Sequence, residues 1–129
     1  MNAFEDPYAF QKLIGFSITR WEADKAVVTL PLANKHTNRY GIPHGGIHAT
    51  LMDTAMGFAG CFTGEAEDKK LAMTLSLTVN YIGPIKGKTL IATGRKVGGG
   101  AKTFFAEGRI EDDLGNLVAT ATGTFRYRG

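Results

Sequence analysis

The stretch GIPHGGIHATLMD, residues 41–53, decides how this 129-residue chain folds. Glycine, proline and histidine punctuate its first half, and its second half begins an apolar segment that continues to residue 61. This pattern predicts a helix over residues 46–61, about 24 Å long at 1.5 Å per residue. The segment is apolar nearly all round, which is typical of a buried helix. Asp53 is the exception, because a carboxylate that is buried without a partner loses its water.

The size and composition indicate a single domain over residues 1–129. Hydrophobic residues make up 43% of the chain and charged residues 21%, which fits a soluble globular protein. The net charge is only +3, and the cations are scattered, so we expect no nucleic-acid partner. We see neither a signal-peptide pattern nor a membrane-spanning run, and we expect a cytoplasmic protein. Cys61 is the single cysteine, and we expect it to be structural.

Outside the central segment, hydrophobic residues recur with a period of two, which predicts strands. A short helix is expected over residues 6–13, with Asp6 as its cap and Pro7 at its first helical position. Two strands joined near residues 22–25 precede the central helix, and four strands in hairpin order follow it. The expected strands lie within residues 16–32 and at residues 73–83, 89–97, 102–111 and 117–128.

Sequential hairpins form an antiparallel sheet, so the expected fold class is α+β, with one curved sheet wrapped around one long central helix. Alternation in the expected strand 73–83 puts Leu75, Leu77, Val79 and Tyr81 on one face. Thr74, Ser76 and Thr78 then fall on the opposite face, where they can meet water or a partner subunit.

Two common kinds of catalytic site find little support in the sequence. His44, His48 and Asp53 offer metal-ligand types, but His48 and Asp53 point about 140° apart around a helix of 3.6 residues per turn. We therefore expect no metal site, and we expect His48 to pack against its surroundings. No G-x-S-x-G motif for a serine nucleophile is present.

Asp53 and the start of the helix can together supply a hydrolytic site. The backbone N–H groups of Gly45 and Gly46 lack intrahelical partners and lie at the positive end of the helix dipole, where they can stabilise an oxyanion. A carboxylate can activate water. Gly45 and Asp53 are about 12 Å apart along the helix, so one chain cannot bring both to one carbonyl. A symmetric dimer could, although a structural carboxylate at a subunit contact remains the alternative.

Three segments carry a resemblance to a known family. NRYGIPHGG at residues 38–46, LMD at 51–53 and TLSLTVNYIGP at 74–84 resemble the hotdog-fold acyl-CoA thioesterases, and most closely the phenylacetate-pathway type. The resemblance extends from about residue 13 to the end of the chain. It implies hydrolysis of acyl-CoA thioesters to a free acid and CoA.

The resemblance also implies roles for individual residues. Asp53 is implied as the general base or nucleophile, and the Gly45 N–H as the group that polarises the thioester carbonyl. Asn38 and His44 are implied to line the site, and Thr74 to hold the attacking water. The implied substrate-binding residues are Gly46, Arg39, Tyr81 and Lys102, with Arg95 and Lys96 as further candidates for the phosphates of CoA.

The family pattern implies a homodimer or homotetramer with the site across an interface. It implies no metal or bound cofactor, because CoA is part of the substrate. The alternatives are a non-catalytic acyl-CoA-binding or regulatory module and a purely structural dimer. A dehydratase of the same fold would need its histidine as the base, which His44 in GIPHGG does not match well. The acyl group and the choice between base and nucleophile for Asp53 stay open.

Overall fold

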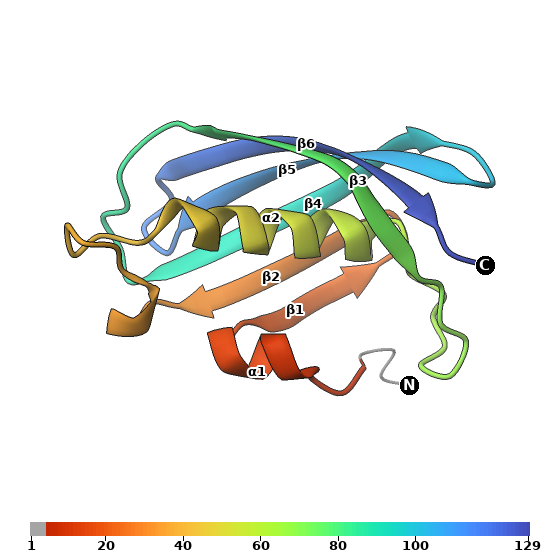
Figure 1. The fold of residues 1–129 in the computed structure, drawn as a ribbon, viewed down its shortest axis with the longest axis horizontal. Coiled ribbons are helices and arrows are strands. Elements are labelled where there is room, and N and C mark those ends of the chain that lie inside the picture. The colour runs from red at the N-terminus through yellow and green to blue at the C-terminus, as the bar shows by residue number, and fades with distance from the viewer. Residues whose placement is uncertain (1–4) are drawn as a thin grey trace.

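A six-stranded antiparallel sheet curves around one long helix, which confirms the expected α+β hotdog fold (Figure 1). The computed structural model describes residues 5–129. The helices are α1 (Ala9–Ile14), the 3₁₀ turn η1 (Asn34–His36) and α2 (Gly45–Ala59). The strands are β1 (Ser17–Glu22), β2 (Lys25–Pro31), β3 (Ala72–Tyr81), β4 (Thr89–Gly99), β5 (Thr103–Asp112) and β6 (Leu117–Tyr127).

The strand order across the sheet is β1-β2-β4-β5-β6-β3. Hairpins join β4 to β5 and β5 to β6, as the sequence predicts. The prediction of hairpin order is wrong for β3, because residues 82–88 carry the chain past the places of β6 and β5 and pair β4 with β2. The green β3 therefore lies beside the blue β6 at the edge of the sheet (Figure 1).

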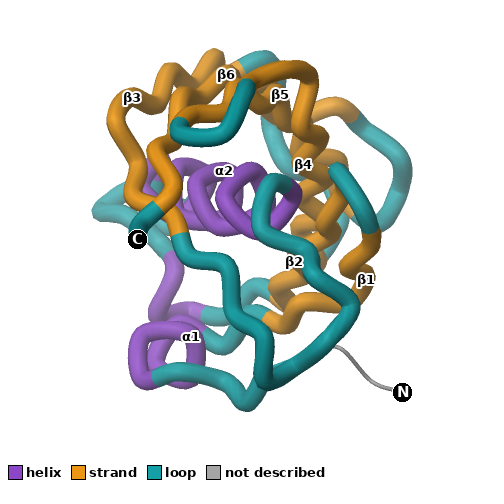
Figure 2. Tube along the Cα trace, turned by 90° about the vertical axis from the view of Figure 1, so that its right-hand side faces the viewer, coloured by secondary structure: helices purple, strands orange, loops and turns teal. Residues whose placement is uncertain are grey.

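Helix α2 lies in the concave side of the sheet, and the strands curve around it when it is viewed along its axis (Figure 2). It packs closely on β4, since a Cβ added at Gly94 would lie 2.4 Å from the carbonyl carbon of Ala55. Side chains of the sheet also bind the end of the helix: Trp21 Nε1 donates to the Phe58 carbonyl at 2.8 Å, and Tyr127 Oη donates to the Gly60 carbonyl at 2.7 Å. The helix is thereby held in one position on the sheet.

The helix boundaries differ slightly from the expected ones. Helix α2 begins at Gly45, because the His44 side chain caps it, and it ends at Ala59. Helix α1 is capped at Tyr8, so the prediction of Asp6 as its cap and Pro7 as its first residue is wrong. Among the described residues, no helix is long and apolar enough to cross a membrane.

The core lies between α2 and the concave face of the sheet. One face of α2 supplies the buried residues of the helix, and alternate residues of β2, β4, β5 and β6 supply the rest. The largest fully buried apolar side chains are Phe104, Phe125, Leu30, Leu51, Met52, Met56, Leu90, Ile110, Val28 and Val118. The helix is therefore less uniformly buried than its apolar sequence suggests, and Asp53 lies on its half-buried side.

Candidate active site

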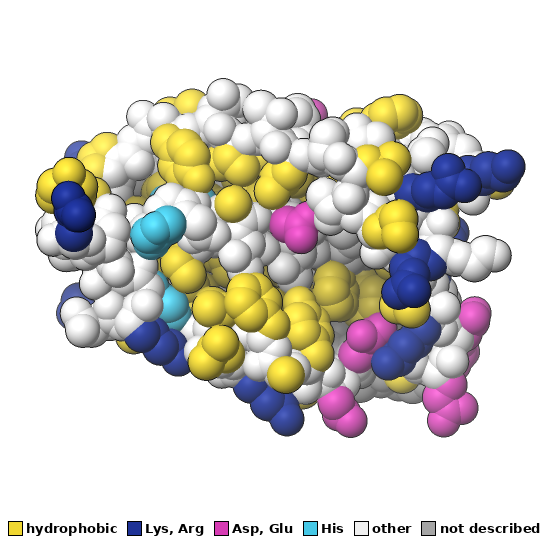
Figure 3. All heavy atoms as spheres, in the orientation of Figure 1, with side chains coloured by type: hydrophobic (Ala, Val, Ile, Leu, Met, Phe, Trp, Pro, Cys, Tyr) yellow, Lys and Arg dark blue, Asp and Glu magenta, His cyan; other side chains and the backbone are white. Residues whose placement is uncertain are grey.

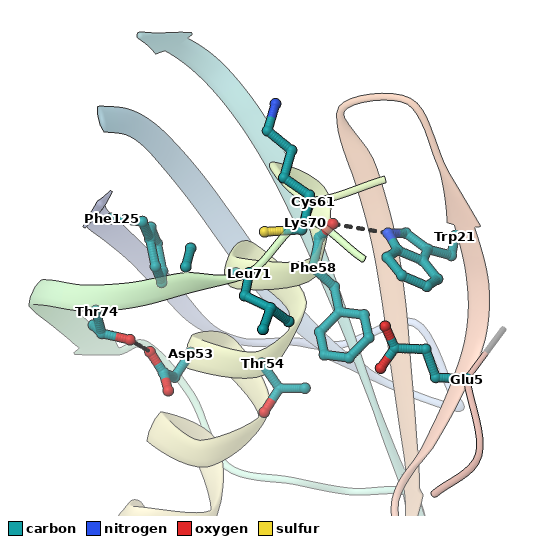
Figure 4. A pocket seen from close by; sticks show the side chains of 12 residues that line it. Glu5, Trp21, Asp53, Thr54, Phe58, Cys61, Lys70, Leu71, Thr74 and Phe125 are labelled. Carbon is teal, nitrogen blue, oxygen red and sulfur yellow. Dashed lines mark hydrogen bonds between the residues drawn. The ribbon is translucent and has the colours of Figure 1, made fainter. Parts of the chain in front are cut away.

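Asp53 on α2 and Thr74 on β3 form the centre of the candidate site. Thr74 Oγ1 donates a hydrogen bond of 2.6 Å to Asp53 Oδ1 (Figure 4). The carboxylate is half-buried and the threonine is exposed, so water can reach the pair. The second oxygen of Asp53 and the lone pairs of the Thr74 hydroxyl remain able to accept hydrogen bonds.

A β-bulge turns Thr74 toward Asp53. Thr74 pairs with Phe125 and Ser76 pairs with Thr124, so Leu75 is one extra residue in β3. An extra residue shifts the alternation of side chains by one position. Leu77 and Val79 pack against the core as expected. The prediction that Leu75 shares their face is wrong, because Leu75 is the extra residue of the bulge and is exposed. The prediction that Thr74 shares the outer face with Ser76 is wrong, because the bulge lies between them.

The start of α2 presents one free backbone donor. His44 Nδ1 accepts the Gly46 N–H at 2.8 Å, so this N–H is occupied by the helix cap. Within residues 5–129, the Gly45 N–H has no acceptor among the hydrogen bonds of the chain. Tyr81 Oη donates to the Gly45 carbonyl at 2.6 Å and fixes this residue from the other side. Gly45 can therefore donate to a substrate oxygen, and Gly46 as placed here cannot.

A side chain at position 45 would also crowd Tyr81. A Cβ added there would lie 3.2 Å from Tyr81 Oη. Tyr81 packs against His48 with ring centroids 5.2 Å apart. His48 packs against its surroundings as expected, and its burial lowers the pKa of the imidazole.

Asn38 and His44 have structural contacts in this chain. Asn38 Oδ1 accepts the Tyr40 N–H at 2.9 Å and shapes the loop before α2. His44 Nδ1 is engaged as the helix cap, so Nε2 is the ring nitrogen that can face a substrate. The structure places both residues at the Gly45 end of α2, and their implied contact with substrate stays a prediction.

An apolar cavity of about 180 Å³ extends from Asp53 along α2 toward the end of the helix. Figure 4 shows Asp53 and Thr74 on one side and the rings of Phe58 and Trp21 on the other. The lining residues are Glu5, Trp21, Asp53, Thr54, Gly57, Phe58, Cys61, Lys70, Leu71, Ala72, Thr74 and Phe125. Such a cavity suits an apolar ligand group that lies beside Asp53.

Two further groups beside this cavity titrate abnormally. Burial raises the pKa of the Cys61 thiol to about 11, so the thiol stays protonated at neutral pH and is a poor nucleophile. Burial also raises the pKa of the Tyr8 phenol, a hydrogen bond with Thr54 lowers it, and the charge of Asp53 raises it. Tyr8 therefore lies near the site. The sequence analysis missed Tyr8 and Trp21, and only their aromatic character could have drawn attention to them.

The basic residues proposed for substrate binding do not lie together. Lys102 lines a hollow at the C-terminal end of β6. Arg95 lies on the outer face of the sheet, where it pairs with Glu107 of β5. Arg39 is exposed in the loop before α2 and lines none of the described cavities. Among residues 5–129, no three His, Cys, Asp or Glu side chains converge as metal ligands.

Asp53 and Gly45 remain eight residues apart on one straight helix, which corresponds to about 12 Å at 1.5 Å per residue. The carboxylate with its threonine and the free N–H therefore form two separate half-sites in one chain. A thioester carbonyl can contact only one of them at a time.

The profile of the thioesterase superfamily matches residues 40–119, which include both half-sites. A relative from Pseudomonas aeruginosa, provisionally named an esterase, is 32% identical over 115 residues. The match covers 88% of this chain and 84% of the relative. The 1,4-dihydroxy-2-naphthoyl-CoA hydrolase of Listeria monocytogenes is 25% identical over 118 residues, covering 92% and 94%.

Solved structures are similar over nearly the whole chain. A Bacillus halodurans protein solved with CoA is 31% identical and superimposes with a TM-score of 0.77, covering 94% of this chain and 78% of the other.

Proposed function

The chain belongs to the thioesterase superfamily, and we propose that it hydrolyses acyl-CoA thioesters to a free acid and CoA. The observation that carries the proposal is the Asp53–Thr74 pair at one end of an apolar cavity. The name of the Listeria relative and the CoA in the Bacillus structure support CoA as the carrier of the acyl group. The finer assignment to the phenylacetate-pathway type stays a prediction.

The proposed chemistry uses a carboxylate and one oxyanion donor. As a base, Asp53 takes a proton from a water that the Thr74 hydroxyl helps to hold, and the water oxygen forms a bond to the thioester carbon. The carbon–sulfur bond then breaks, and the proton passes to the departing thiolate. As a nucleophile, Asp53 attacks the carbon itself, and the carbon–sulfur bond breaks to release the thiolate and leave a mixed anhydride. Water then hydrolyses the anhydride, which frees the acid, regenerates the Asp53 carboxylate and supplies the proton that the thiolate takes up. A thiol of pKa about 8.5 leaves without a strong acid, so the reaction calls for no metal or bound cofactor.

The oxyanion donor has to come from a second copy of the chain. The proposed assembly is a homodimer, alone or within a tetramer, in which Gly45 of one subunit faces Asp53 of the other. The exposed edge strand β3 supports this assembly, because it leaves backbone groups unpaired beside exposed apolar side chains. These side chains are Leu71, Met73, Leu75, Tyr81 and Ile82.

The cavity beside Asp53 is proposed to hold the acyl group. Its walls include Trp21, Phe58 and Phe125, which favour an apolar or aromatic acyl group over a polar one. Its volume of about 180 Å³ limits the size of the acyl group that one subunit can enclose.

The test is to incubate the protein with short-chain, medium-chain and aromatic acyl-CoAs and to follow the release of free thiol. Asp53→Ala is expected to lose at least about 10²-fold in kcat, the lower range for acid–base groups. Native circular dichroism and an unchanged oligomeric state are the controls. Binding of acyl-CoA without turnover by the wild type would favour the non-catalytic module, and full activity in Asp53→Ala would refute the role of Asp53.

A further inference from the structure

Basic side chains line a hollow at the C-terminal end of β6. It has a volume of about 500 Å³, and its lining includes four cations from three segments: Lys70, Lys102, Arg126 and Arg128. We call it the basic hollow. Lys and Arg side chains gather at the end of the molecule where the chain terminates (Figures 1 and 3). No acidic side chain is among its lining residues.

The segments around the basic hollow are held together by short backbone hydrogen bonds. The Tyr127 N–H donates to the Lys102 carbonyl, and the Arg128 N–H donates to the Leu71 carbonyl, each at 2.8 Å. The Lys70 ammonium lies 4.2 Å from the centre of the Tyr127 ring, a cation–π contact that restrains it. The backbones that carry these cations are therefore held close together, and the Lys70 side chain is restrained, before any ligand arrives.

These cations have no ionic partners within the described part of the chain. The ion pairs there are Arg20–Glu22 and Arg109–Glu111, and neither involves the basic hollow. Glu65, Glu67 and Asp68 precede Lys70 in its loop, but none of them lines the hollow. Unneutralised like charges that are held close together repel one another, and a polyanionic ligand would remove this cost.

The mixture of arginine and lysine matches phosphate. The guanidinium of Arg126 or Arg128 can form two parallel hydrogen bonds to phosphate oxygens, and the ammonium of Lys102 adds a compact charge. A phosphate monoester carries a charge of about −1.5 to −2 at pH 7 and offers three acceptor oxygens. Simple carboxylates carry less charge and would leave more of the cluster unneutralised.

Resting on the proposed function, we propose that the basic hollow binds the phosphorylated nucleotide end of CoA. Lys70 lines both the basic hollow and the cavity beside Asp53. It lies four residues before Thr74, so at most about 13 Å of extended chain separates the two, at 3.3 Å per residue. An extended pantetheine arm spans that distance. With the thioester at Asp53, the arm can follow the wall formed by Leu71 and Ala72 to the hollow, while the acyl group packs against Trp21 and Phe58. This assignment retains Lys102 from the residues that the sequence indicates for phosphate binding, and it adds Lys70, Arg126 and Arg128.

The test compares one acyl group on three carriers: CoA, dephospho-CoA, which lacks the 3′-phosphate, and pantetheine, which lacks the nucleotide. The variant is the triple substitution Lys102→Ala, Arg126→Ala and Arg128→Ala, which leaves the cavity residue Lys70 in place. It is expected to lower kcat/KM for acyl-CoA about tenfold or more, mainly through KM, as loss of charged hydrogen bonds predicts. For acyl-pantetheine, kcat/KM should stay within about twofold.

Two matched controls separate position from total charge. The triple substitution Lys12→Ala, Lys86→Ala and Lys88→Ala removes three exposed cations outside the hollow and should leave kcat/KM for acyl-CoA unchanged. Arg126→Lys with Arg128→Lys should retain part of the affinity, because the charge remains. Raising the salt concentration should lower kcat/KM for acyl-CoA in the wild type and have little effect in the hollow variant.

Several outcomes would overturn the assignment. One is that the hollow variant hydrolyses acyl-CoA as fast as the wild type does. Another is that its kcat/KM falls by the same factor for acyl-pantetheine as for acyl-CoA. The hollow variant could also lose more kcat/KM for an acyl group on an acidic carrier protein than for acyl-CoA. That result would assign the hollow to the carrier protein instead. If the wild type hydrolyses no thioester, calorimetry with adenosine 3′,5′-bisphosphate still tests the hollow, so failure of the proposed function and failure of this site are distinguishable.

Discussion

Thr74 and Asp53 are joined by a hydrogen bond because β3 contains one residue more than the stretch of β6 that it pairs with. Leu75 is that residue, and it brings a threonine from the outer face of the sheet to the face that carries α2. Bulges often redirect a side chain beside a functional site, and here the redirected group is a hydroxyl beside a carboxylate.

Replacing Gly45 with proline should lower kcat about 10²-fold, because it removes an oxyanion donor. Proline suits the first position of a helix, so α2 should still form. Gly45→Ala is the matched control, since it brings the same Cβ close to Tyr81 but keeps the N–H. Steady-state kinetics should show a much larger loss for proline than for alanine. Equal losses in the two variants would point to crowding of Tyr81 instead.

Mixing two inactive variants should restore activity if the site is shared between subunits. Asp53→Asn lacks the carboxylate and Gly45→Pro lacks the donor, so a mixed dimer has one intact site and one doubly defective site. Random exchange of equal amounts should recover about one quarter of the wild-type activity in a two-fold dimer. The measurement is thiol release after subunit exchange, with each variant alone as the control. No recovery despite demonstrated exchange would place the whole site within one chain.

Thr74→Val should lower kcat about tenfold, equivalent to one hydrogen bond of ~1.4 kcal/mol, while KM changes little. Valine keeps the β-branched shape but cannot donate to Asp53 or hold a water. Thr74→Ser is the matched control and should keep most of the rate, because it retains the hydroxyl. If valine and serine behave alike, the hydroxyl does not take part in the reaction.

Deleting Leu75 should reduce kcat as much as Thr74→Val does. Without the extra residue the alternation of β3 becomes continuous, so Thr74 leaves the side of Asp53 or Leu77 leaves the core. The control is Leu75→Met, which keeps the residue count and an apolar side chain of similar volume at this exposed position of the proposed interface, so kcat should stay within about twofold. Circular dichroism checks that both variants fold. A deletion variant with the wild-type rate would show that the bulge is dispensable.

Asp112→Asn should lower the melting temperature at pH 7, and the difference should shrink in acid. Burial alone would raise the pKa of Asp112, but hydrogen bonds from Asn116, Lys86 and Gly87 hold it below its ordinary value of 3.8. The carboxylate therefore stabilises the fold above about pH 4, and this contribution is lost as the pH falls toward the depressed pKa. Thermal melts of both proteins from pH 7 to pH 3 measure it. A difference that does not change with pH would contradict this account.

The parts of the fold that depend on local pattern were predictable from the sequence. The run from Ile47 to Phe58 is too apolar to be anything but a packed helix, and hairpin turns of glycine and aspartate locate β5 and β6. The place of β3 was not predictable, because its pairing with β6 joins segments more than thirty residues apart. The alternation of polar and apolar residues within a strand does not specify which other strand it will pair with.

The candidate site shows the same limit at the level of single residues. Asp53 stood out because a charge in an apolar helix is unusual, and Gly45 because helix starts leave N–H groups free. The direction of Thr74 was missed, because threonine, leucine and serine alternate smoothly in sequence whether or not Leu75 bulges. The four cations of the basic hollow lie far apart in sequence, and only the backbone bonds between β6 and its neighbours bring them together.

The edge position of β3 has a consequence for how the protein would respond to dilution. If a second copy covers this edge and completes the site, then separated subunits each hold a carboxylate without its oxyanion donor. Specific activity should then fall as the protein is diluted below the dissociation constant of the dimer, by mass action alone. A saturating substrate that bridges both subunits should oppose this fall, so the rate at low protein concentration would report on assembly as well as on chemistry.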